Sequence, residues 1–266
     1  MKKVAIVHND RVTTQVAVRH LQVLLAEKGI LQDQQHPDLV ISVGGDGTLI
    51  SAFHKYKQQL DKVCFAGIHT GHLGFYTDWR NYDMEKLVDA LASHPVEENE
   101  VGYPLLDMKV TTSYGEKRFL ALNEASIKRI SKTMEAEVWL GGERFENFRG
   151  DGLCVSTPTG STAYSKSLGG AVIHPRLKTL QLTEIASINN LVFRTVGSPI
   201  VIAPDEWITI VPKISDRVVV IVDGERISLT DVQKVDYKIA AEEIRFYQYG
   251  HHHFWERVND AFIGDR

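Results

Sequence analysis

The alternation of strand-like and helix-like segments over the first hundred residues is the feature that most constrains the fold of this chain. Three short apolar runs are typical of buried strands: residues 2–9, 38–43 and 62–70. Three further segments repeat apolar side chains at helical spacing: residues 12–28 (with Val16, Leu21, Leu24 and Leu25), 49–60 and 83–93. Strands that alternate with helices form parallel sheets, so we expect an α/β domain over residues 1–100.

The pattern changes after about Tyr103, where the segments become short, alternating and rich in β-formers. Pairs of such segments flank the turn signals Gly141-Gly142 and Asp223-Gly224, so we expect a β-rich domain over residues 101–250. Residues 251–266 return to a helical pattern, and we expect this helix to pack back on the N-terminal domain. Its apolar side chains are Phe254, Trp255, Val258, Phe262 and Ile263.

The composition excludes several classes of protein. The 266 residues carry a formal net charge of -4 and no run of Lys and Arg, so we expect neither a nucleic acid nor a membrane as partner. No apolar stretch is long enough to span a membrane or to form a signal peptide, which favours a cytoplasmic protein. Cys64 and Cys154 are expected to be buried thiols, and the three adjacent histidines at 251–253 lack the spacing of a metal site.

A glycine-rich segment, "GGDGT" at residues 44–48, directly follows the second strand. Glycines at the carboxyl end of a parallel strand let backbone N–H groups approach an anion closely. The segment lacks the lysine of a Walker A loop, and Ile50 stands where the dinucleotide fingerprint needs a glycine. Asp46 would repel phosphate unless it holds Mg²⁺ or accepts a proton from an attacking hydroxyl. The alternative is that the segment is only a tight turn.

A second motif, "RGDGLCVSTPTGSTAYSKSLGG", covers residues 149–170. A strand over residues 153–156 leads into small and hydroxyl residues, where Ser161 or Thr162 is placed to cap a short helix. Such a helix start would present N–H groups to a phosphate or a ring edge. The alternative is an ordinary loop rich in Ser and Thr that ends in a helix cap.

Two segments between these motifs are also candidates for ligand contacts. Phe75 and Tyr76 follow a glycine-rich turn and are placed to lie against a base, although aromatic rings after a turn usually belong to the core. Asn123 and Glu124 form a polar pair inside an apolar strand. A buried polar pair needs partners, which are either backbone groups or hydroxyls of a ligand.

With these four segments in this order, the chain resembles the bacterial NAD kinases of the ATP-NAD kinase family. The segments "GGDGT", "NEAS" and "GDGLCVSTPTGSTAYS" match that family's motifs in order and spacing, and the similarity covers nearly the whole chain. A loop like "GGDGT" also occurs in diacylglycerol and sphingosine kinases and, in a related form, in phosphofructokinases. The segment "TPTGSTAY" together with the upstream "NE" separates the NAD kinases from them.

The resemblance implies a reaction, a fold and an assembly. The reaction is phosphorylation of the 2′-hydroxyl of the adenosine ribose of NAD by ATP, with Mg²⁺ or another divalent cation, to give NADP. The fold is a Rossmann-like parallel sheet in the N-terminal domain, a β-sandwich-like C-terminal domain and a C-terminal helix that returns to the N-terminal domain. The assembly is a homodimer or homotetramer in which a neighbouring subunit completes each site.

The resemblance also assigns roles to individual residues. Asp46 would be the general base, and the segment around Ala186 resembles the part that reaches a neighbour's site. No side chain is assigned to a metal, and Asp223 receives no role. The expected contacts with NAD and ATP are Gly45, Gly47, Thr48, Phe75, Asn123, Glu124, Arg149, Asp151, Thr159, Thr162, Ala163, Tyr164, Ser165, Lys166, Ser167 and Ala186.

Two other functions stay open on the sequence alone. A lipid kinase of the diacylglycerol type shares the first motif, but this chain shows no evident membrane-binding surface and carries "TPTGSTAY". A non-catalytic sensor of NAD or NADP would gain little from an acid beside phosphates, which argues against it because Asp46 is present.

Overall fold

The computed structural model describes residues 2–71, 74–96, 98–213, 217–247 and 254–264. The chain forms two compact units, residues 1–102 with 242–266, and residues 103–241. The histidines at 251–253 lie outside the described residues, so their expected lack of a metal stays a prediction. None of the described helices is long and apolar enough to cross a membrane.

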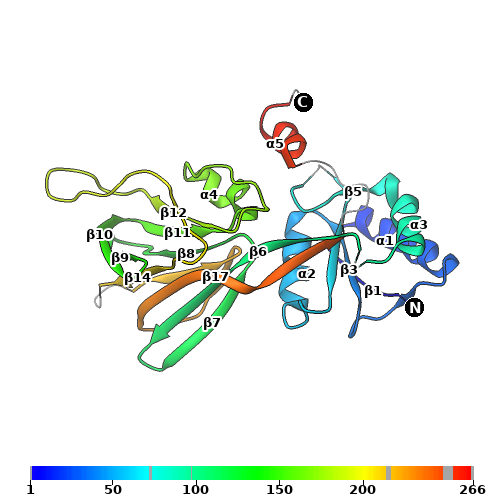
Figure 1. The fold of residues 1–266 in the computed structure, drawn as a ribbon, viewed down its shortest axis with the longest axis horizontal. Coiled ribbons are helices and arrows are strands. Elements are labelled where there is room, and N and C mark those ends of the chain that lie inside the picture. Colours follow the sequence, from blue (N-terminus) through cyan, green and yellow to red (C-terminus); the bar gives the residue numbers. More distant parts are fainter. Residues whose placement is uncertain (1, 72–73, 97, 214–216, 248–253, 265–266) are drawn as a thin grey trace. The chain divides into compact units, whose positions relative to one another are not determined.

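The first unit is built on a parallel sheet, as the alternation of segments predicts (Figure 1). Its strands are β1 Lys3–His8, β2 Leu31–Gln32, β3 Leu39–Gly44, β4 Cys64–His69, β5 Trp79–Arg80 and the end of β17 Val232–Tyr247. The order is β17-β4-β3-β1-β2, β5 also pairs with β4, and all these pairs are parallel. The carboxyl ends of β1, β3 and β4 therefore meet at one edge.

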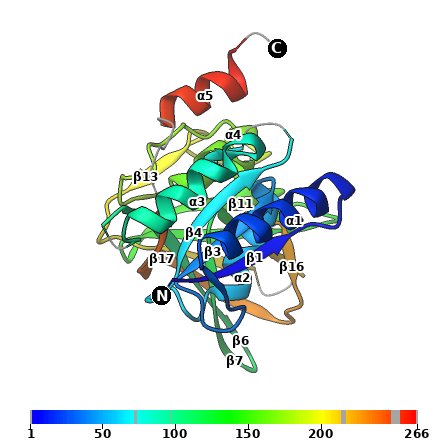
Figure 2. The same ribbon diagram turned by 90° about the vertical axis from the view of Figure 1, so that its right-hand side faces the viewer.

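Helices cover both faces of this sheet. They are α1 Val12–Glu27, α2 Asp46–Tyr56 and α3 Met84–Ser93, the last preceded by the 3-10 turn η1 Asn81–Asp83. α1 and α3 lie side by side on one face and α2 lies on the other (Figure 2). Val16 is not on the buried face of α1: it is 60% exposed, because the buried face is formed by Thr14, Ala17, Val18, Leu21 and Leu25.

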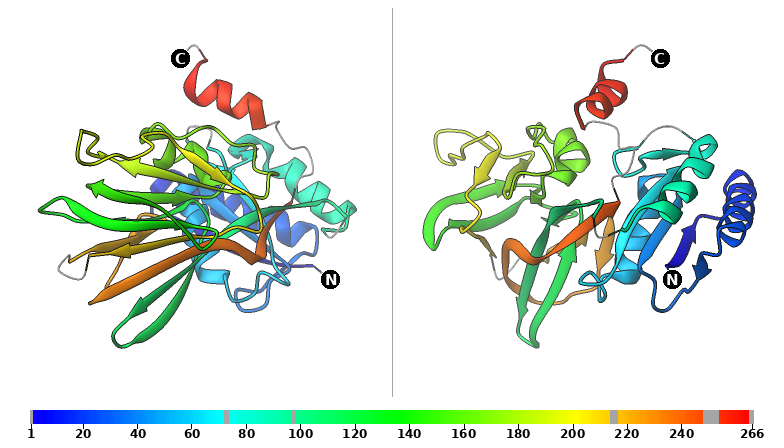
Figure 3. Two further views of the ribbon diagram at one scale, coloured as in Figure 1. Left: turned by 60° about the vertical axis from the view of Figure 1, so that its left-hand side comes forward. Right: turned by 45° about the vertical axis from the view of Figure 1, so that its right-hand side comes forward.

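The second unit is a β-sandwich (Figure 3). One sheet contains β6 Glu100–Thr112, β7 Gly115–Ala121, β9 Met134–Leu140, β10 Glu143–Gly150, β14 Ile208–Pro212 and the first part of β17. The other has the order β13-β12-β11-β8-β15-β16, formed by β8 Glu124–Lys128, β11 Gly152–Ser156, β12 Leu180–Ile185, β13 Ile200–Ile202, β15 Val219–Val222 and β16 Glu225–Ile227. Inward side chains of both sheets form one apolar core, and the hairpins expected at Gly141-Gly142 and Asp223-Gly224 are present.

Three short elements complete the fold: η2 Thr159–Thr162, α4 Tyr164–Ser167 and α5 Phe254–Phe262. The C-terminal helix α5 belongs to the first unit, as expected, where Arg257 forms an ion pair of 2.6 Å with Asp78. Its expected apolar face is only partly right, because Phe254 and Arg257 are buried whereas Trp255 and Ile263 are exposed. Cys64 and Cys154 are free and buried, as predicted.

Candidate active site

The glycine-rich segment 44–48 lies at the junction of β3 and α2. α2 begins at Asp46, three residues earlier than the expected start at Leu49, so Asp46 and Thr48 belong to the first helical turn instead of a loop. Gly45 is the extended N-cap residue, and its carbonyl accepts the Thr48 N–H at 2.9 Å. An acid in the first turn is favourable because the N-terminus of a helix carries positive dipole character.

Gly44 can only be glycine in this arrangement. Its φ is +155, and a Cβ atom there would lie 2.2 Å from Thr48 Oγ1. Beside it is a cavity of about 430 Å³ whose lining combines the carboxyl end of β1 with the start of α2: Val7, His8, Asn9, Arg11, Gly45, Gly47, Thr48 and Ser51. The positive dipole character of the α2 N-terminus and the Arg11 side chain make this cavity suitable for an anion.

The Asp46 side chain is held by backbone amides of a distant segment. Asp46 Oδ2 accepts the Phe75 N–H at 2.8 Å, and Oδ1 accepts the Tyr76 N–H at 2.9 Å. Gly74 lies against the same carboxylate, since a Cβ atom at that position would be 2.2 Å from Oδ1. Both oxygens of Asp46 therefore have fixed positions, and each keeps a lone pair for a further partner.

Burial raises the pKa of the Asp46 carboxyl above its ordinary value. The amides of Tyr76 and Phe75 and the charge of Arg257 oppose this shift, while the charge of Asp78 adds to it. Arg257 thus links α5 to this corner of the first unit through its ion pair with Asp78. The ring of Phe75 stacks on Phe262 of α5, with centroids 5.6 Å apart.

Asn123 and Glu124 mark the end of one strand and the start of another. The sequence placed this pair inside a single strand, which is wrong: β7 ends at Ala121 in one sheet and β8 begins at Glu124 in the other. At the break the backbone loses its ladder partners, and side chains replace them. Thr157 Oγ1 donates to the Leu122 carbonyl at 2.6 Å, and Thr159 Oγ1 donates to the same carbonyl at 3.0 Å.

The segment 157–160 packs so tightly on this break that it needs a glycine. A Cβ atom at Gly160 would lie 2.0 Å from the Asn123 carbonyl oxygen. The Thr157 N–H also donates to that oxygen at 2.9 Å. The hydroxyls of Thr157 and Thr159 lie 2.9 Å from each other and are buried. This part of the second motif therefore holds the backbone that carries Asn123 and Glu124 in place.

Neither Ser161 nor Thr162 caps α4, contrary to the expectation. Ser161 Oγ donates to the Ile173 carbonyl and accepts the Ile173 N–H, and Thr162 Oγ1 donates to the Thr159 carbonyl. The chain turns at Ala163, so α4 spans only four residues and starts at Tyr164 without a side-chain cap. A helix this short offers little dipole, and the small residues serve close packing instead.

The side chains of α4 divide between the interior and the surface. Ser165 is buried, with its hydroxyl 2.9 Å from Gln181 Nε2 and 3.3 Å from Thr183 Oγ1. Tyr164 is half-buried and its hydroxyl accepts a hydrogen bond of 2.5 Å from Lys128 Nζ. Lys166 is half-buried and Ser167 is exposed. Tyr164, Lys166 and Ser167 are therefore the members of α4 that a ligand can reach.

The Glu124 carboxyl is buried next to another acid. Burial, followed by the negative charge of Asp223, raises the pKa of Glu124 to about 7, against the opposing effects of the Tyr164 backbone amide and Lys128. Its Oε2 atom is buried and makes no hydrogen bond within the described part of the chain. A buried carboxyl near neutrality is typical of functional sites.

Asp223 is the residue of this site that the sequence did not assign. Its Oδ2 accepts the Leu122 N–H at 2.9 Å, and its Oδ1 accepts the N–H groups of Asn123 and Glu124 at 2.7 and 3.2 Å. In the sequence Asp223 appears only as the first residue of a hairpin turn. No local pattern shows that its carboxylate faces a segment a hundred positions earlier.

A third group of expected residues gathers at the other end of β11. The Asp151 N–H donates to the Ile185 carbonyl at 2.9 Å, and Ala186 follows with φ +46. The Arg149 guanidinium lies over the Phe193 ring, 4.5 Å from its centroid. Asp151 and Ala186 are exposed, so this group forms a surface next to the loop that begins at Ala186.

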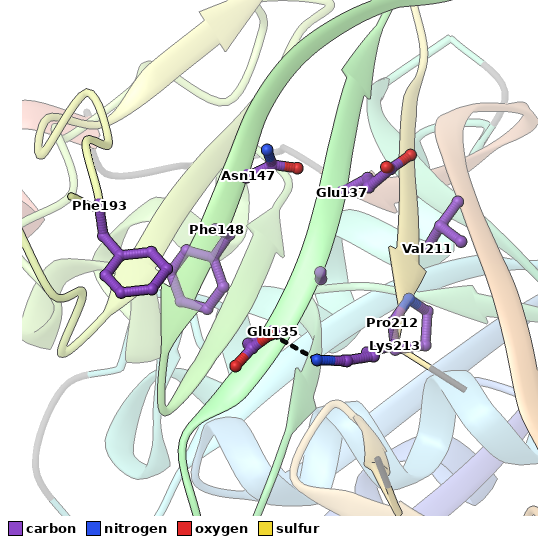
Figure 4. A pocket seen from close by; sticks show the side chains of 9 residues that line it. Glu135, Glu137, Asn147, Phe148, Phe193, Val211, Pro212 and Lys213 are labelled. Atoms are coloured by element: carbon purple, nitrogen blue, oxygen red, sulfur yellow. Dashed lines mark hydrogen bonds and ion pairs between the residues drawn. The ribbon is translucent and has the colours of Figure 1, made fainter. Parts of the chain in front are cut away.

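A further cavity of the second unit lies apart from these groups of residues. This cavity of about 910 Å³ is mainly apolar, with Phe148, Phe193, Val211 and Pro212 in its lining (Figure 4). Its lysine, Lys213, is bound to Glu135 at 3.1 Å. None of the expected site residues lines this cavity. Arg149 lies over the ring of Phe193, which does line it.

The structure thus brings the expected residues together in three places. Gly45, Asp46, Gly47, Thr48 and Phe75 are in the first unit; Asn123, Glu124, Thr159 and residues 162–167 are around the strand break; Arg149, Asp151 and Ala186 are at the far end of β11. Among the described residues, no group of three His, Cys, Asp or Glu side chains is arranged to hold a metal ion.

Comparisons with known proteins agree with the motifs. Residues 10–96 match the ATP-NAD kinase N-terminal domain and residues 122–247 match the ATP-NAD kinase C-terminal domain. The chain belongs to the ATP-NAD kinase family. The NAD kinase of Lactobacillus acidophilus is 61% identical to it over 264 residues, 99% of this chain and 98% of that relative. The NAD kinase of Enterococcus faecalis is 54% identical over 265 residues, 99% of each chain.

Solved structures of NAD kinases and NADH kinases share the fold. Yeast NADH kinase, complexed with NADH, superposes with a TM-score of 0.84 at 19% identity over 100% of this chain and 89% of that chain. An NAD kinase from Archaeoglobus fulgidus, in complex with ATP, superposes with a TM-score of 0.78 at 21% identity over 97% of this chain and 99% of that chain. The expected fold, an α/β domain followed by a β-rich domain, is confirmed.

Proposed function

We propose that Asp46 is the general base of the reaction that this ATP-NAD kinase performs, the phosphorylation of NAD by ATP at the 2′-hydroxyl of its adenosine ribose. The observation that carries this proposal is the pair of backbone hydrogen bonds from Phe75 and Tyr76 to the Asp46 carboxylate. They fix both oxygens of a residue whose neighbours in the chain, Gly45 and Gly47, line the cavity at the start of α2. A carboxylate held in this way can accept the proton that the attacking hydroxyl of NAD must lose.

The proton and the phosphoryl group move in opposite directions in this step. The Asp46 carboxylate takes the proton of the 2′-hydroxyl as that oxygen bonds to the γ-phosphorus of ATP. The bond between the γ-phosphorus and the bridging oxygen breaks, and ADP leaves with its electron pair. Asp46 then returns the proton to solvent. Its raised pKa suits this role, because a base is most effective when its pKa approaches the working pH.

The start of α2 is the proposed position of the ATP phosphates. Gly45, Gly47 and Thr48 line the cavity there, and the helix N-terminus favours negative charge. A divalent cation, when bound, neutralises the phosphates of ATP. A cation in a nucleotide site is held chiefly by phosphates and water, with one or two carboxylates. Because no group of three His, Cys, Asp or Glu side chains among the described residues is arranged to hold it, phosphates and water would be its main ligands.

The strand break and α4 are the proposed contacts of NAD. Side chains or backbone groups at Asn123, Glu124, Thr162, Ala163, Tyr164, Lys166 and Ser167 are proposed to bind it, and Phe75 stays a contact expected from the sequence. Thr159 and Ser165 were expected to join them, but their buried hydroxyls already bind protein groups. We therefore propose that these two residues position the others instead of touching NAD.

We also propose that the chain acts as a homodimer or homotetramer. Asp151 and Ala186 are exposed, and with Arg149 they would complete the site of a neighbouring copy. The loop between β12 and β13, which begins at Ala186, carries Leu191 and Val192, which are 92% and 81% exposed. Adjacent exposed apolar side chains are typical of an interaction surface, and a second copy is the partner that we propose for it. Free buried thiols support the proposed cytoplasmic location.

Formation of NADP is the direct test of the function. The protein is incubated with ATP, Mg²⁺ and NAD, and NADP is measured with an NADP-specific dehydrogenase. We expect NADP to accumulate in proportion to the enzyme. Phosphate appearing on diacylglycerol without NADP would favour the lipid kinase, and binding of NAD without turnover would favour the sensor. The matches to both NAD kinase domains do not favour either alternative.

A further inference from the structure

The first residue of the turn between β15 and β16 is bound far outside its own hairpin. Asp223 and Gly224 have φ values of +48 and +84, the backbone of a two-residue hairpin turn in which Asn serves as well as Asp. The Asp223 carboxylate, however, accepts three N–H groups of residues 122–124, 99 to 101 positions away. The Asp223 N–H in turn donates to the Glu124 carbonyl at 2.9 Å.

These bonds complete the hydrogen bonding of the strand break. The carbonyls of Leu122 and Asn123 are bound by Thr157 and Thr159, and the N–H groups of the same two residues are bound by Asp223. Leu122 and Asn123 are buried, and a buried N–H group without a partner is costly. The place of Asn123 and Glu124 in space therefore depends on Asp223 directly.

We propose that Asp223 is a positioning residue for NAD, acting through Asn123 and Glu124. Its carboxylate holds the backbone of these two residues, and its charge acts on the Glu124 carboxyl. This inference rests on the proposed contact of Asn123 and Glu124 with NAD. It assigns to the hairpin turn a role in substrate binding that a turn with glycine or serine at this position would not have.

The charge of Asp223 gives the proposal a measurable signature. After burial, Asp223 is the largest cause that raises the pKa of Glu124 to about 7. The other groups that act on the pKa of Glu124 are the Tyr164 amide at the start of α4 and Lys128 of β8, which both lower it. Near neutral pH the carboxyl is partly protonated, so its ability to donate or accept a hydrogen bond to NAD changes with pH.

The test compares Asp223→Asn with Glu225→Gln, which removes the same charge from the same hairpin at an exposed site. The KM for NAD, the KM for ATP and kcat are measured between about pH 6 and pH 8.5. Asn keeps one acceptor oxygen but loses the bond to one N–H group and the negative charge. We expect the KM for NAD to rise about tenfold, with the KM for ATP within about twofold of the wild type. The midpoint of the pH dependence of the KM for NAD moves to lower pH, because the charge that raises the pKa of Glu124 is removed. Glu225→Gln stays like the wild type.

Two results would overturn the inference. The first is that Asp223→Asn has the same kinetic constants and the same pH dependence as Glu225→Gln. A fall in stability, kcat and both affinities together, with no shift of the pH midpoint, is the second, because it shows a merely structural role. If wild-type protein forms no NADP at all, it is the proposed function that fails, and the two failures are therefore distinct.

Glu124→Gln keeps the test decisive if Asp223→Asn does not fold. This variant leaves the Asp223 turn intact and removes the titration of the carboxyl. We expect the pH dependence of the NAD KM near pH 7 to disappear. Its persistence in Glu124→Gln would contradict the proposed path from Asp223 through Glu124.

Discussion

Asp46 is positioned by backbone groups, and this makes its place sensitive to the residues of the facing segment. Its two oxygens accept the N–H groups of Phe75 and Tyr76, which lie 29 and 30 positions later in the chain. Gly74 permits this approach because it has no side chain. A base that must meet a hydroxyl in line with phosphorus depends on such placement, since a displacement of about 1 Å can cost about 100-fold in rate.

Gly74→Ala tests this placement. The new Cβ would start 2.2 Å from Asp46 Oδ1, so the carboxylate or the segment must move. We expect kcat to fall by about 10- to 100-fold, with a small change in the melting temperature. Gly71→Ala is the matched control, because a Cβ at Gly71 meets no atom within 4 Å. Equal rates for the two variants would show that the backbone contacts to Asp46 are unimportant.

At this scale the sequence predicts motif residues well and their supports poorly. Asp46 and Asn123 stand out because a polar residue interrupts apolar or glycine-rich surroundings. Asp223 does not, since its pattern is that of a turn and its partners are a hundred positions away. Ser165 looks like a ligand contact in the motif but is bound to Gln181, and a hydroxyl in a sequence does not show which way it points.

At the scale of elements, the loop between β12 and β13 is held by two carboxyls. Glu184 of β12 accepts hydrogen bonds from Thr195 Oγ1 at 2.8 Å and from the Gly197 N–H at 3.2 Å. Glu146 of β10 accepts the Val196 N–H at 3.2 Å. Burial, followed by the charge of Glu184, raises the pKa of Glu146 to about 7. Glu146 and Glu184 therefore hold the loop that begins at Ala186. This pair of carboxyls is most stable when one proton is bound between them.

Stability should fall as this proton is lost. The folded pKa of Glu146 lies above its ordinary 4.5, so the protonated form stabilises the fold and the free energy of unfolding decreases as pH rises through 4.5 to about 7. Glu146→Gln keeps an acceptor for Val196 and removes the charge. We expect it to be more stable than the wild type above pH 7, by about 1 kcal/mol, because solvent screens the charge of a half-exposed carboxyl.

Urea unfolding of the wild type and Glu146→Gln below and above this pH window measures the difference. Glu143→Gln, at an exposed position of the same strand, is the control and should follow the wild type. Glu124 titrates in the same range, so part of the wild-type pH dependence remains in Glu146→Gln. A variant that is less stable than the wild type at high pH would contradict the account of the two carboxyls.

At the scale of the whole molecule, the periodicity of the sequence predicts the kind of each unit but not its details. Apolar runs and helical spacing give the parallel sheet of the first unit and the hairpins of the second. They do not show that α2 begins at Asp46, because the start depends on Gly45 as an extended N-cap residue. Nor do they show the break at Asn123, because the β-like pattern of the sequence is continuous there although β7 and β8 belong to different sheets.

The proposed assembly makes a prediction at the same scale. If a neighbour's Ala186 segment completes the site, dilution to the monomer should abolish activity. Leu191→Asp, on the loop after Ala186, should weaken assembly and activity in step, because a charge would be placed in the interface. Sedimentation and activity are measured over the same range of concentration. A fully active monomer would contradict the proposal.

The most direct test of the central claim is the rate of Asp46→Asn across a Mg²⁺ titration. Asn keeps the turn and one acceptor oxygen but cannot take the proton of the 2′-hydroxyl. We predict that kcat falls by about 10²- to 10⁴-fold at every Mg²⁺ concentration, while NAD affinity measured by calorimetry changes little. Asp61→Asn, at an exposed site, should keep the wild-type rate. Recovery at high Mg²⁺ would make Asp46 a cation contact instead of a base, and a rate like that of the wild type would contradict any catalytic role for Asp46.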